Sequence, residues 1–110
     1  VVPKGVKVVG ESAFCNCTNL VKVELPSTLQ TIEKEAFYNC SSLLSIKVPE
    51  GTEEIGSEAF YACVNLEEVE LPTTTTLKVI GDEAFDQCHS LARVTTPLPL
   101  IPDVYNTFMD

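Results

Sequence analysis

Hydrophobic positions recur along the chain in a fixed order, with a period of about 23 residues. An Ala-Phe pair is followed, at steps of three residues, by a Cys, a Leu and then a Val or Ile, and a Pro closes the unit. The Phe positions are Phe14, Phe37, Phe60 and Phe85, so the first two steps are equal and the third is longer by two. We place the two extra residues of the last step in the threonine tract 73–76. Regular repetition of this kind predicts an array of stacked units.

Each unit predicts two short strands and one turn. Residues 20–26 end in an alternation of apolar and other residues, which is typical of a strand with one buried face, and proline then ends the strand. A second short strand is expected at residues 29–32. The Ala-Phe-x-x-Cys spacing suits one helical or 3-10 turn that points Phe and Cys inward. Because one unit is too short to enclose a core, we predict a β-rich solenoid of about four units with parallel strand ladders.

The array is expected to cover residues 1–97, in four units centred on the four phenylalanines. The proline-rich residues 98–110 are expected to form a C-terminal cap or the start of a fifth unit. Pro3 falls in the proline column, and Phe108 lies one period past Phe85. This register favours a piece cut from a longer array, or a short array with unusual ends.

The composition fits one folded domain with an acidic surface. The chain has 110 residues, of which 45% are hydrophobic, and its net charge is −9. This charge argues against nucleic acid or an anionic membrane as a partner, and no apolar run approaches the roughly 20 residues of a membrane span. Residues 43–90 hold two lysines and ten acidic residues, a net charge of −8. Such a surface favours a basic partner or divalent cations through long-range attraction.

The pattern A-F-x-x-C-x-x-L-x-x-V-x-L-P resembles the BspA-type leucine-rich repeats of bacterial and protist surface proteins, over residues 1–97. One departure is Thr96, which stands where earlier units have Leu25, Val48 and Leu71. The resemblance implies a right-handed leucine-rich-repeat solenoid and a non-enzymatic, protein-binding module. It also implies a surface or secreted adhesin that engages extracellular-matrix or host proteins. The alternative is a structural array that self-associates end to end, because open terminal coils expose strand edges.

The outward positions of the strands that end in proline are the candidate partner-binding surface, since the strand face of a repeat solenoid is a common recognition surface. These positions are Lys22, Glu24, Ser45, Lys47, Glu68, Glu70, Arg93 and Thr95. Lys47 is expected between Glu24 and Glu70, and Glu68 beside Arg93. The charges either serve a partner or only support the stacking of the strands. Tyr38 and Tyr61, expected to stack, are candidate aromatic anchors or pack along the coil edge.

Four of the five cysteines share one column of the repeat: Cys17, Cys40, Cys63 and Cys88. We expect buried free thiols, because an in-phase column points its Cβ atoms in the same direction, which disfavours disulfides. Four thiolates in a line also fail to form the tetrahedron that zinc requires. Cys15 neighbours the buried Phe column and is expected to be half-exposed. One thiol should therefore react quickly with a maleimide, and four only after denaturation.

No catalytic residue, cofactor or metal is expected. The single His89 follows Cys88 but should turn outward, and the sequence contains no glycine-rich phosphate loop. Asn16 and Asn39 each begin an N-x-[ST] pattern, which marks either a glycosylation acceptor or a polar turn that bonds to the backbone. The sequence therefore favours binding over catalysis.

Overall fold

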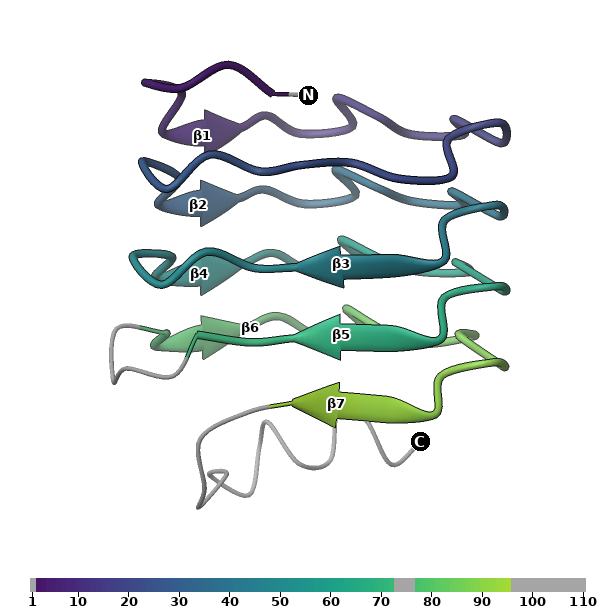
Figure 1. Cartoon of the computed structure of the whole chain (residues 1–110). Helices are drawn as coiled ribbons and strands as arrows, with labels where there is room; N and C mark the ends of the chain where they lie inside the picture. Colours follow the sequence, from purple (N-terminus) through teal and green to yellow (C-terminus); the bar gives the residue numbers. More distant parts are fainter. Residues whose placement is uncertain (1, 73–76, 96–110) are drawn as a thin grey trace.

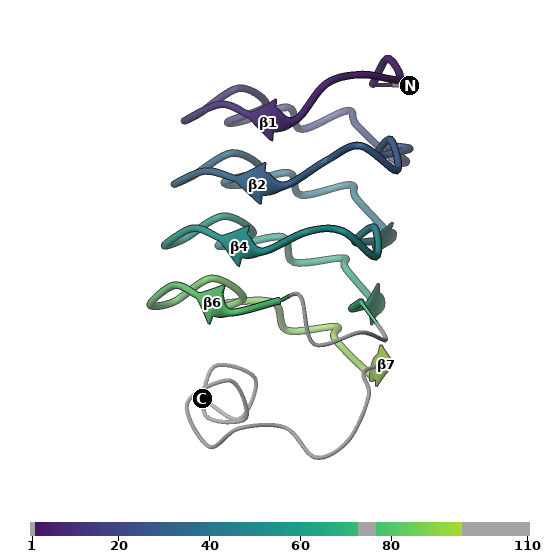
Figure 2. The same ribbon diagram turned by 90° about the vertical axis from the view of Figure 1, so that its left-hand side faces the viewer.

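The computed structural model describes residues 2–72 and 77–95, which form a stack of similar coils (Figure 1). One sheet has the strand order β1-β2-β4-β6 and the other the order β3-β5-β7. The strands are β1 (Val8–Val9), β2 (Thr31–Ile32), β3 (Ser45–Lys47), β4 (Glu54–Ile55), β5 (Glu68–Glu70), β6 (Val79–Ile80) and β7 (Arg93–Thr95). Figure 2 shows the first sheet stacked strand over strand, with β7 on the far side of the coil. The predicted β-rich solenoid with parallel ladders is confirmed.

The strand register follows the period of the repeat. All five strand pairs are parallel, and Val8 pairs with Thr31, which lies one period later in the sequence. Across the threonine tract the offset grows by two, as between Glu54 and Val79. The placement of the insertion in residues 73–76 falls outside the described residues, as do the predictions for residues 98–110. Within the described residues, identical columns of the sequence therefore lie over one another.

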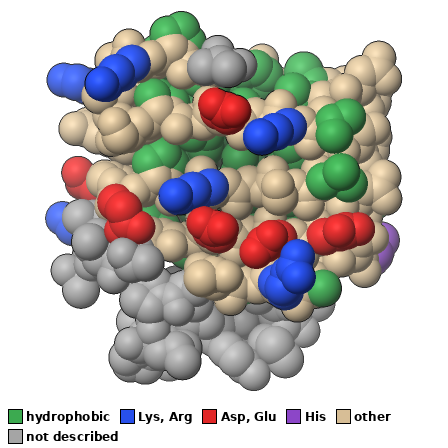
Figure 3. Space-filling model, viewed as in Figure 1, with side chains coloured by type: hydrophobic (Ala, Val, Ile, Leu, Met, Phe, Trp, Pro, Cys, Tyr) green, Lys and Arg blue, Asp and Glu red, His purple; other side chains and the backbone are tan. Residues whose placement is uncertain are grey.

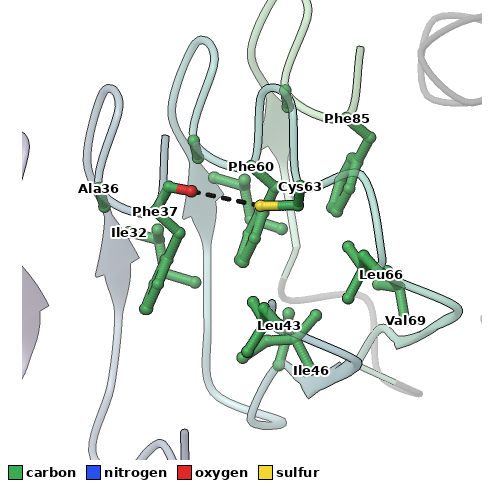
Figure 4. Close-up of a cluster of buried hydrophobic side chains, with 14 of the residues drawn as sticks. Ile32, Ala36, Phe37, Leu43, Ile46, Phe60, Cys63, Leu66, Val69 and Phe85 are labelled. Carbon is green, nitrogen blue, oxygen red and sulfur yellow. Dashed lines mark hydrogen bonds between the residues drawn. The ribbon is translucent and has the colours of Figure 1, made fainter. Parts of the chain in front are cut away.

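The core consists of these stacked columns. The rings of Phe14, Phe37, Phe60 and Phe85 form one continuous stack, with centroids 5.1 Å apart at each step and interplanar angles of 4–6°. Figure 4 shows Ile32, Leu43 and their equivalents packed around the rings. Every unit thus buries its apolar face only against its neighbours, as the repeat pattern requires.

Thr52 interrupts this apolar core and was not foreseen from the sequence. It is fully buried in the column that holds Leu29 and Leu77 in neighbouring coils. Its hydroxyl donates a hydrogen bond to the Leu29 carbonyl at 3.2 Å. The bond offsets the cost of burying a hydroxyl, so the core accepts a polar residue at this position.

The segment from Ala to Cys in each unit is a pair of turns, so the expected helical or 3-10 turn is wrong; the described residues contain no helix. Residues on both sides of each Ala-Phe pair adopt positive φ, as at Ser12 (58°) and Asn16 (61°). The backbone N–H groups also alternate between two coils. Cys15 donates within its own coil to Ser12, whereas Phe14 donates to Ala36 of the next coil at 2.7 Å. A helix keeps its N–H bonds within one segment, so this sharing between coils excludes it.

The first coil lacks its predicted outer strand. Residues 20–26 form no strand, whereas the equivalent residues of the next three coils form β3, β5 and β7. The only backbone bond from this stretch to the second coil's strand region joins the Leu44 N–H to the Val21 carbonyl at 3.2 Å, within the described residues. Lys22 and Glu24 therefore lie on a segment that does not pair with β3, although the Glu24 carbonyl accepts a hydrogen bond from the Val2 N–H.

The cysteine column forms a ladder of weak hydrogen bonds between coils. The thiols of Cys40, Cys63 and Cys88 each contact a Phe carbonyl of the preceding coil at 3.2–3.3 Å, and Figure 4 shows the bond from Cys63 to Phe37. All five cysteines are free. Cys40 and Cys63 are fully buried, as predicted, but Cys17 and Cys88 are only partly covered because they belong to outer coils. A thiol in this column thus fills the core and also supplies a weak donor.

This burial revises the expected thiol chemistry. Contact with the Cys40 thiol and burial both raise the pKa of Cys63, and burial raises the pKa of Cys88 to about 11. Burial and the charge of Glu35 also raise the pKa of the half-exposed Cys15. Since the thiolate is the reactive form, these shifts slow alkylation without blocking the accessible sites.

We expect maleimide to label Cys15, Cys17 and Cys88 in the folded protein, and Cys40 and Cys63 only after unfolding in urea. Mass spectrometry of the intact and digested protein gives both the number and the sites of the labels. The control variant Cys15→Ser should lose one native label and keep Cys40 and Cys63 protected. Native labelling of Cys63 at the rate of Cys15 would contradict the stacked core.

Candidate functional site

The candidate surface is the strand ribbon, defined as β3, β5 and β7 together with residues 22–25, which do not pair with β3. Its strands alternate as predicted, with Ile46, Val69 and Val94 turned inward. Ser45 and Lys47 are exposed beside Ile46, whereas the equivalent Glu68 and Glu70 are half-buried. Arg93 and Thr95 are exposed on β7. Backbone hydrogen bonds and the core hold these strands, so the outward side chains are available for contacts.

The predicted charge neighbours are confirmed for Lys47 with Glu70 and for Glu68 with Arg93, which lie opposite each other in the ladder, but not for Lys47 with Glu24, whose segment does not pair with β3. Arg93 forms an ion pair and hydrogen bond with Glu68 at 3.4 Å. Among the described residues, however, no ion pair within 4.0 Å joins Lys47 to Glu24 or Glu70. Glu24 instead lies 3.8 Å from Lys22 on the same segment, because the first coil's strand is not paired with β3. Figure 3 shows the charged side chains of this face in two separate rows.

Tyr38 and Tyr61 stack as predicted, with ring centroids 5.1 Å apart and an interplanar angle of 8°. They lie in the turns that lead from β2 to β3 and from β4 to β5, and both are half-buried. Desolvation and the charge of Asp86 raise the pKa of the Tyr61 phenol, which therefore stays a neutral hydrogen-bonding group at physiological pH. The two rings form one rigid aromatic surface, separate in sequence from the ribbon.

Acidic side chains gather in the same turns. Desolvation and the charges of Asp86 and Glu58 raise the pKa of the Glu83 carboxyl. Within residues 2–72 and 77–95, no group of three His, Cys, Asp or Glu side chains is arranged to hold a metal ion. The acidic turns thus contribute negative potential rather than a coordination site.

The asparagines of the two N-x-[ST] patterns are linked to each other. The Asn39 amide donates a hydrogen bond to the Asn16 side-chain oxygen at 3.0 Å, and both residues have positive φ. Asn65, in another polar column, donates to the Ser41 carbonyl of the preceding coil at 2.8 Å. The Asn16 and Asn39 side chains thus bond to each other between coils, whereas the bond to a backbone carbonyl comes from Asn65.

The ribbon contains a groove that the sequence does not predict. It lies between residues 22–25 and β3, with a volume of about 550 Å³, and its lining includes Val23, Leu25 and Pro49. No sequence signal distinguishes the first coil from the others at these positions, because the columns continue through it.

The part of the chain that the structure describes contains no helix able to span a membrane.

Comparison with known proteins identifies the repeat. The model of the BspA type leucine rich repeat region matches residues 1–108 in six copies. A leucine-rich repeat protein of T. pallidum is 40% identical, with a TM-score of 0.80 over 84% of this chain and 42% of its own. A leucine-rich repeat protein of Bacteroides ovatus is 38% identical, with a TM-score of 0.77 over 82% of this chain and 23% of its own.

A leucine rich cell surface protein of Faecalibacterium prausnitzii is 28% identical, with a TM-score of 0.69 over 89% of this chain and 25% of its own. No curated protein matches the chain. The chain spans 42% or less of the length of each of these three structures. Repeats of this kind generally serve as scaffolds for protein–protein binding. With the family model matching nearly the whole length, the chain belongs to the BspA-type leucine-rich repeat family.

Proposed function

We propose that this repeat module belongs to a surface or secreted adhesin and binds a protein partner, of the extracellular matrix or of a host, through the strand ribbon. The observation that carries the proposal is the ribbon itself, a rigid parallel ladder whose outward charged and polar side chains are not needed for the core. The likeness to a leucine rich cell surface protein supports the location. The proposed mechanism is recognition without catalysis.

Charge supports a basic partner. Glu68 and Glu70 lie side by side on β5, and residues 43–90 carry a net charge of −8. A negative field of this size attracts basic surfaces and raises the association rate, an effect that salt weakens. In this proposal Tyr38 and Tyr61 act as anchors at the edge of the same contact, because rigid aromatic rings contribute strongly to interfaces.

Charge reversal on two faces tests the proposal. The variant Glu68→Lys/Glu70→Lys reverses the ribbon, and Glu53→Lys/Glu54→Lys makes the same change in net charge at β4, on the other sheet. Against a panel of purified extracellular-matrix proteins in biolayer interferometry, the ribbon variant should bind at least about tenfold more weakly, which is roughly 1.4 kcal/mol. The β4 variant should bind within about threefold of the parent.

Two results would contradict the ribbon as the contact. One is equal weakening by both variants, which would indicate a general charge effect. The other is a panel in which no matrix protein binds the parent chain. Light scattering of the same samples tests the alternative of end-to-end assembly, since a mass that rises with concentration would favour self-association over capture of a partner.

A further inference from the structure

The strand ribbon is broken at one junction, between the first and second coils. Three other junctions carry the same backbone hydrogen bond near the end of the ribbon: Val2 to Glu24 at 3.0 Å, Val48 to Glu70 at 2.8 Å, and Leu71 to Thr95 at 2.7 Å. By the repeat register, the missing member of this series is the bond from the Leu25 N–H to the Lys47 carbonyl. Among the described residues it is not formed.

The opening is confined to the ribbon. On the opposite side, the same two coils are joined by β1 and β2, and their Phe rings stack at the usual 5.1 Å. In the turn, Phe14 and Asn16 donate to the next coil at 2.7 Å, as their equivalents do further along. Among the described residues, only the bond from the Leu44 N–H to the Val21 carbonyl joins the outer segments of these two coils, at the start of the ribbon. The first coil's outer segment is therefore bonded to the second coil at Val21 but not at Leu25, and Figure 1 draws it without a strand arrow above β3.

The resulting groove has the size and character of a binding site. Its volume of about 550 Å³ falls within the roughly 300–1,000 Å³ typical of ligand pockets. Val23, Leu25 and Pro49 give it apolar lining, and Figure 3 shows hydrophobic side chains in the hollow between the two rows of charged ones. The groove thus combines an apolar floor with unpaired backbone donors and acceptors, among them the Leu25 N–H and the Lys47 carbonyl.

The positive and negative charges of the residues that line the groove cancel. Lys22 and Lys47 contribute two positive charges, and Glu24 and Glu50 two negative ones. An anionic or cationic ligand would meet groups of both signs, whereas a neutral dipolar group meets no net charge. A peptide unit is such a group, with one N–H and one C=O in fixed geometry.

We infer that this groove binds an extended, uncharged peptide segment of a protein partner. One backbone amide of the segment accepts a hydrogen bond from the Leu25 N–H and donates another to the Lys47 carbonyl. A small apolar side chain of the segment packs on Val23 and Pro49. Backbone pairing of this kind is how extended peptides add to sheet edges elsewhere. The inference rests on the proposed function, because it specifies what part of the protein partner enters the ribbon.

Amide hydrogen exchange of the free protein tests whether the groove is open in solution. The Leu25 amide should exchange at least about tenfold faster than the amides of Val48 and Leu71, which are hydrogen-bonded at the equivalent positions. Equal protection of the three amides would show that the ladder is closed and would overturn the inference.

Titration with a defined peptide tests the occupant. The probe is acetyl-Thr-Val-Thr-Val-Thr-amide, which is uncharged and favours the extended conformation. At about 5 mM, which would more than half saturate a site with a Kd near 1 mM, it should shift the amide resonances of Leu25, Lys47 and Val48. The same peptide with every amide nitrogen fully methylated should bind at least about tenfold more weakly, because it has no amide N–H to donate to the Lys47 carbonyl. Absent shifts, or equal binding of both peptides, would overturn the inference.

A matched pair of variants locates the binding site. Ser45→Trp places a large side chain beside the groove, and Arg93→Trp places one at the equivalent position of a closed junction. Only Ser45→Trp should abolish the peptide shifts; loss in both variants, or in neither, would place the peptide elsewhere. A failed peptide titration alongside matrix binding that depends on Glu68 and Glu70 would remove this inference and leave the proposed function. Peptide shifts at the groove, without matrix binding that depends on Glu68 and Glu70, would remove the proposed function and leave peptide binding at the groove.

Discussion

Replacing Phe60 with Ala should lower the free energy of unfolding by about 3–5 kcal/mol, as buried Phe→Ala changes do. Phe60 is fully buried and stacks on Phe37 above and Phe85 below, so the substitution opens a cavity and removes two ring contacts. Since small domains have only about 5–15 kcal/mol of total stability, the loss is a large fraction. Urea denaturation followed by circular dichroism measures it.

Phe14→Ala is the matched control, because it removes the same ring at the end of the stack. Phe14 is half-buried and has one ring neighbour, Phe37. Its loss should therefore cost clearly less than the loss of Phe60. Equal costs for the two variants would mean that the rings do not form one continuous stack with an inside and an end.

Gly81→Ala should also destabilise the fold strongly, although it adds only one methyl group. A Cβ at Gly81 would lie 2.3 Å from the Ser57 nitrogen and 2.7 Å from the Gly56 carbonyl carbon. Both are backbone atoms of the preceding coil, so two coils would have to move apart to admit it. Overpacking usually costs about 1–3 kcal/mol, and a clash with backbone at this distance should fall at or above the upper end. Thermal denaturation gives the shift in Tm.

Gly10 occupies the same column two coils before Gly56 and serves as the control. A Cβ there would meet nothing closer than the Glu33 Oε1 atom at 3.9 Å, which is ordinary contact with a flexible side chain. Gly10→Ala should be neutral or should stabilise by about 0.4–1 kcal/mol, because alanine restricts the unfolded chain. If Gly10→Ala and Gly81→Ala shifted Tm alike, the close approach of the coils at Gly81 would be disproved.

The repeat columns allowed the stacking order to be predicted from the sequence. Residues that share a column one period apart, such as Ile46 and Val69, pair in the parallel ladder. The two-residue insertion also predicted the changed offset that pairs Val69 with Val94. The reason is physical, since a column of identical apolar residues is buried efficiently only if its members lie over one another. The stacked Tyr38 and Tyr61 rings follow from the same rule.

The backbone path of the turns could not be predicted in this way. Positive φ occurs at Glu35 and Glu58, residues with no particular preference for that conformation, because bonds to the next coil hold the turn. A spacing of three residues is equally compatible with a helical turn, which explains the wrong prediction.

The candidate site was predicted in part. The repeat columns placed Glu68 beside Arg93, and these two residues form an ion pair. The same columns implied a paired strand at residues 22–25, which the structure does not have. The columns are the same in every coil, so they carry no signal that one junction opens. The groove depends on the geometry of the whole first coil and was visible only in the structure.

Nuclear Overhauser contacts between side chains of adjacent coils test the central claim, that matching positions of successive units lie directly over one another. The account predicts contacts between the rings of Phe37 and Phe60, whose centroids lie 5.1 Å apart, and between the side chains of Ile32 and Ile55, which pair in the sheet. Strong contacts that instead join the Phe rings to different, unrelated columns would contradict the stacked solenoid and every inference drawn from it.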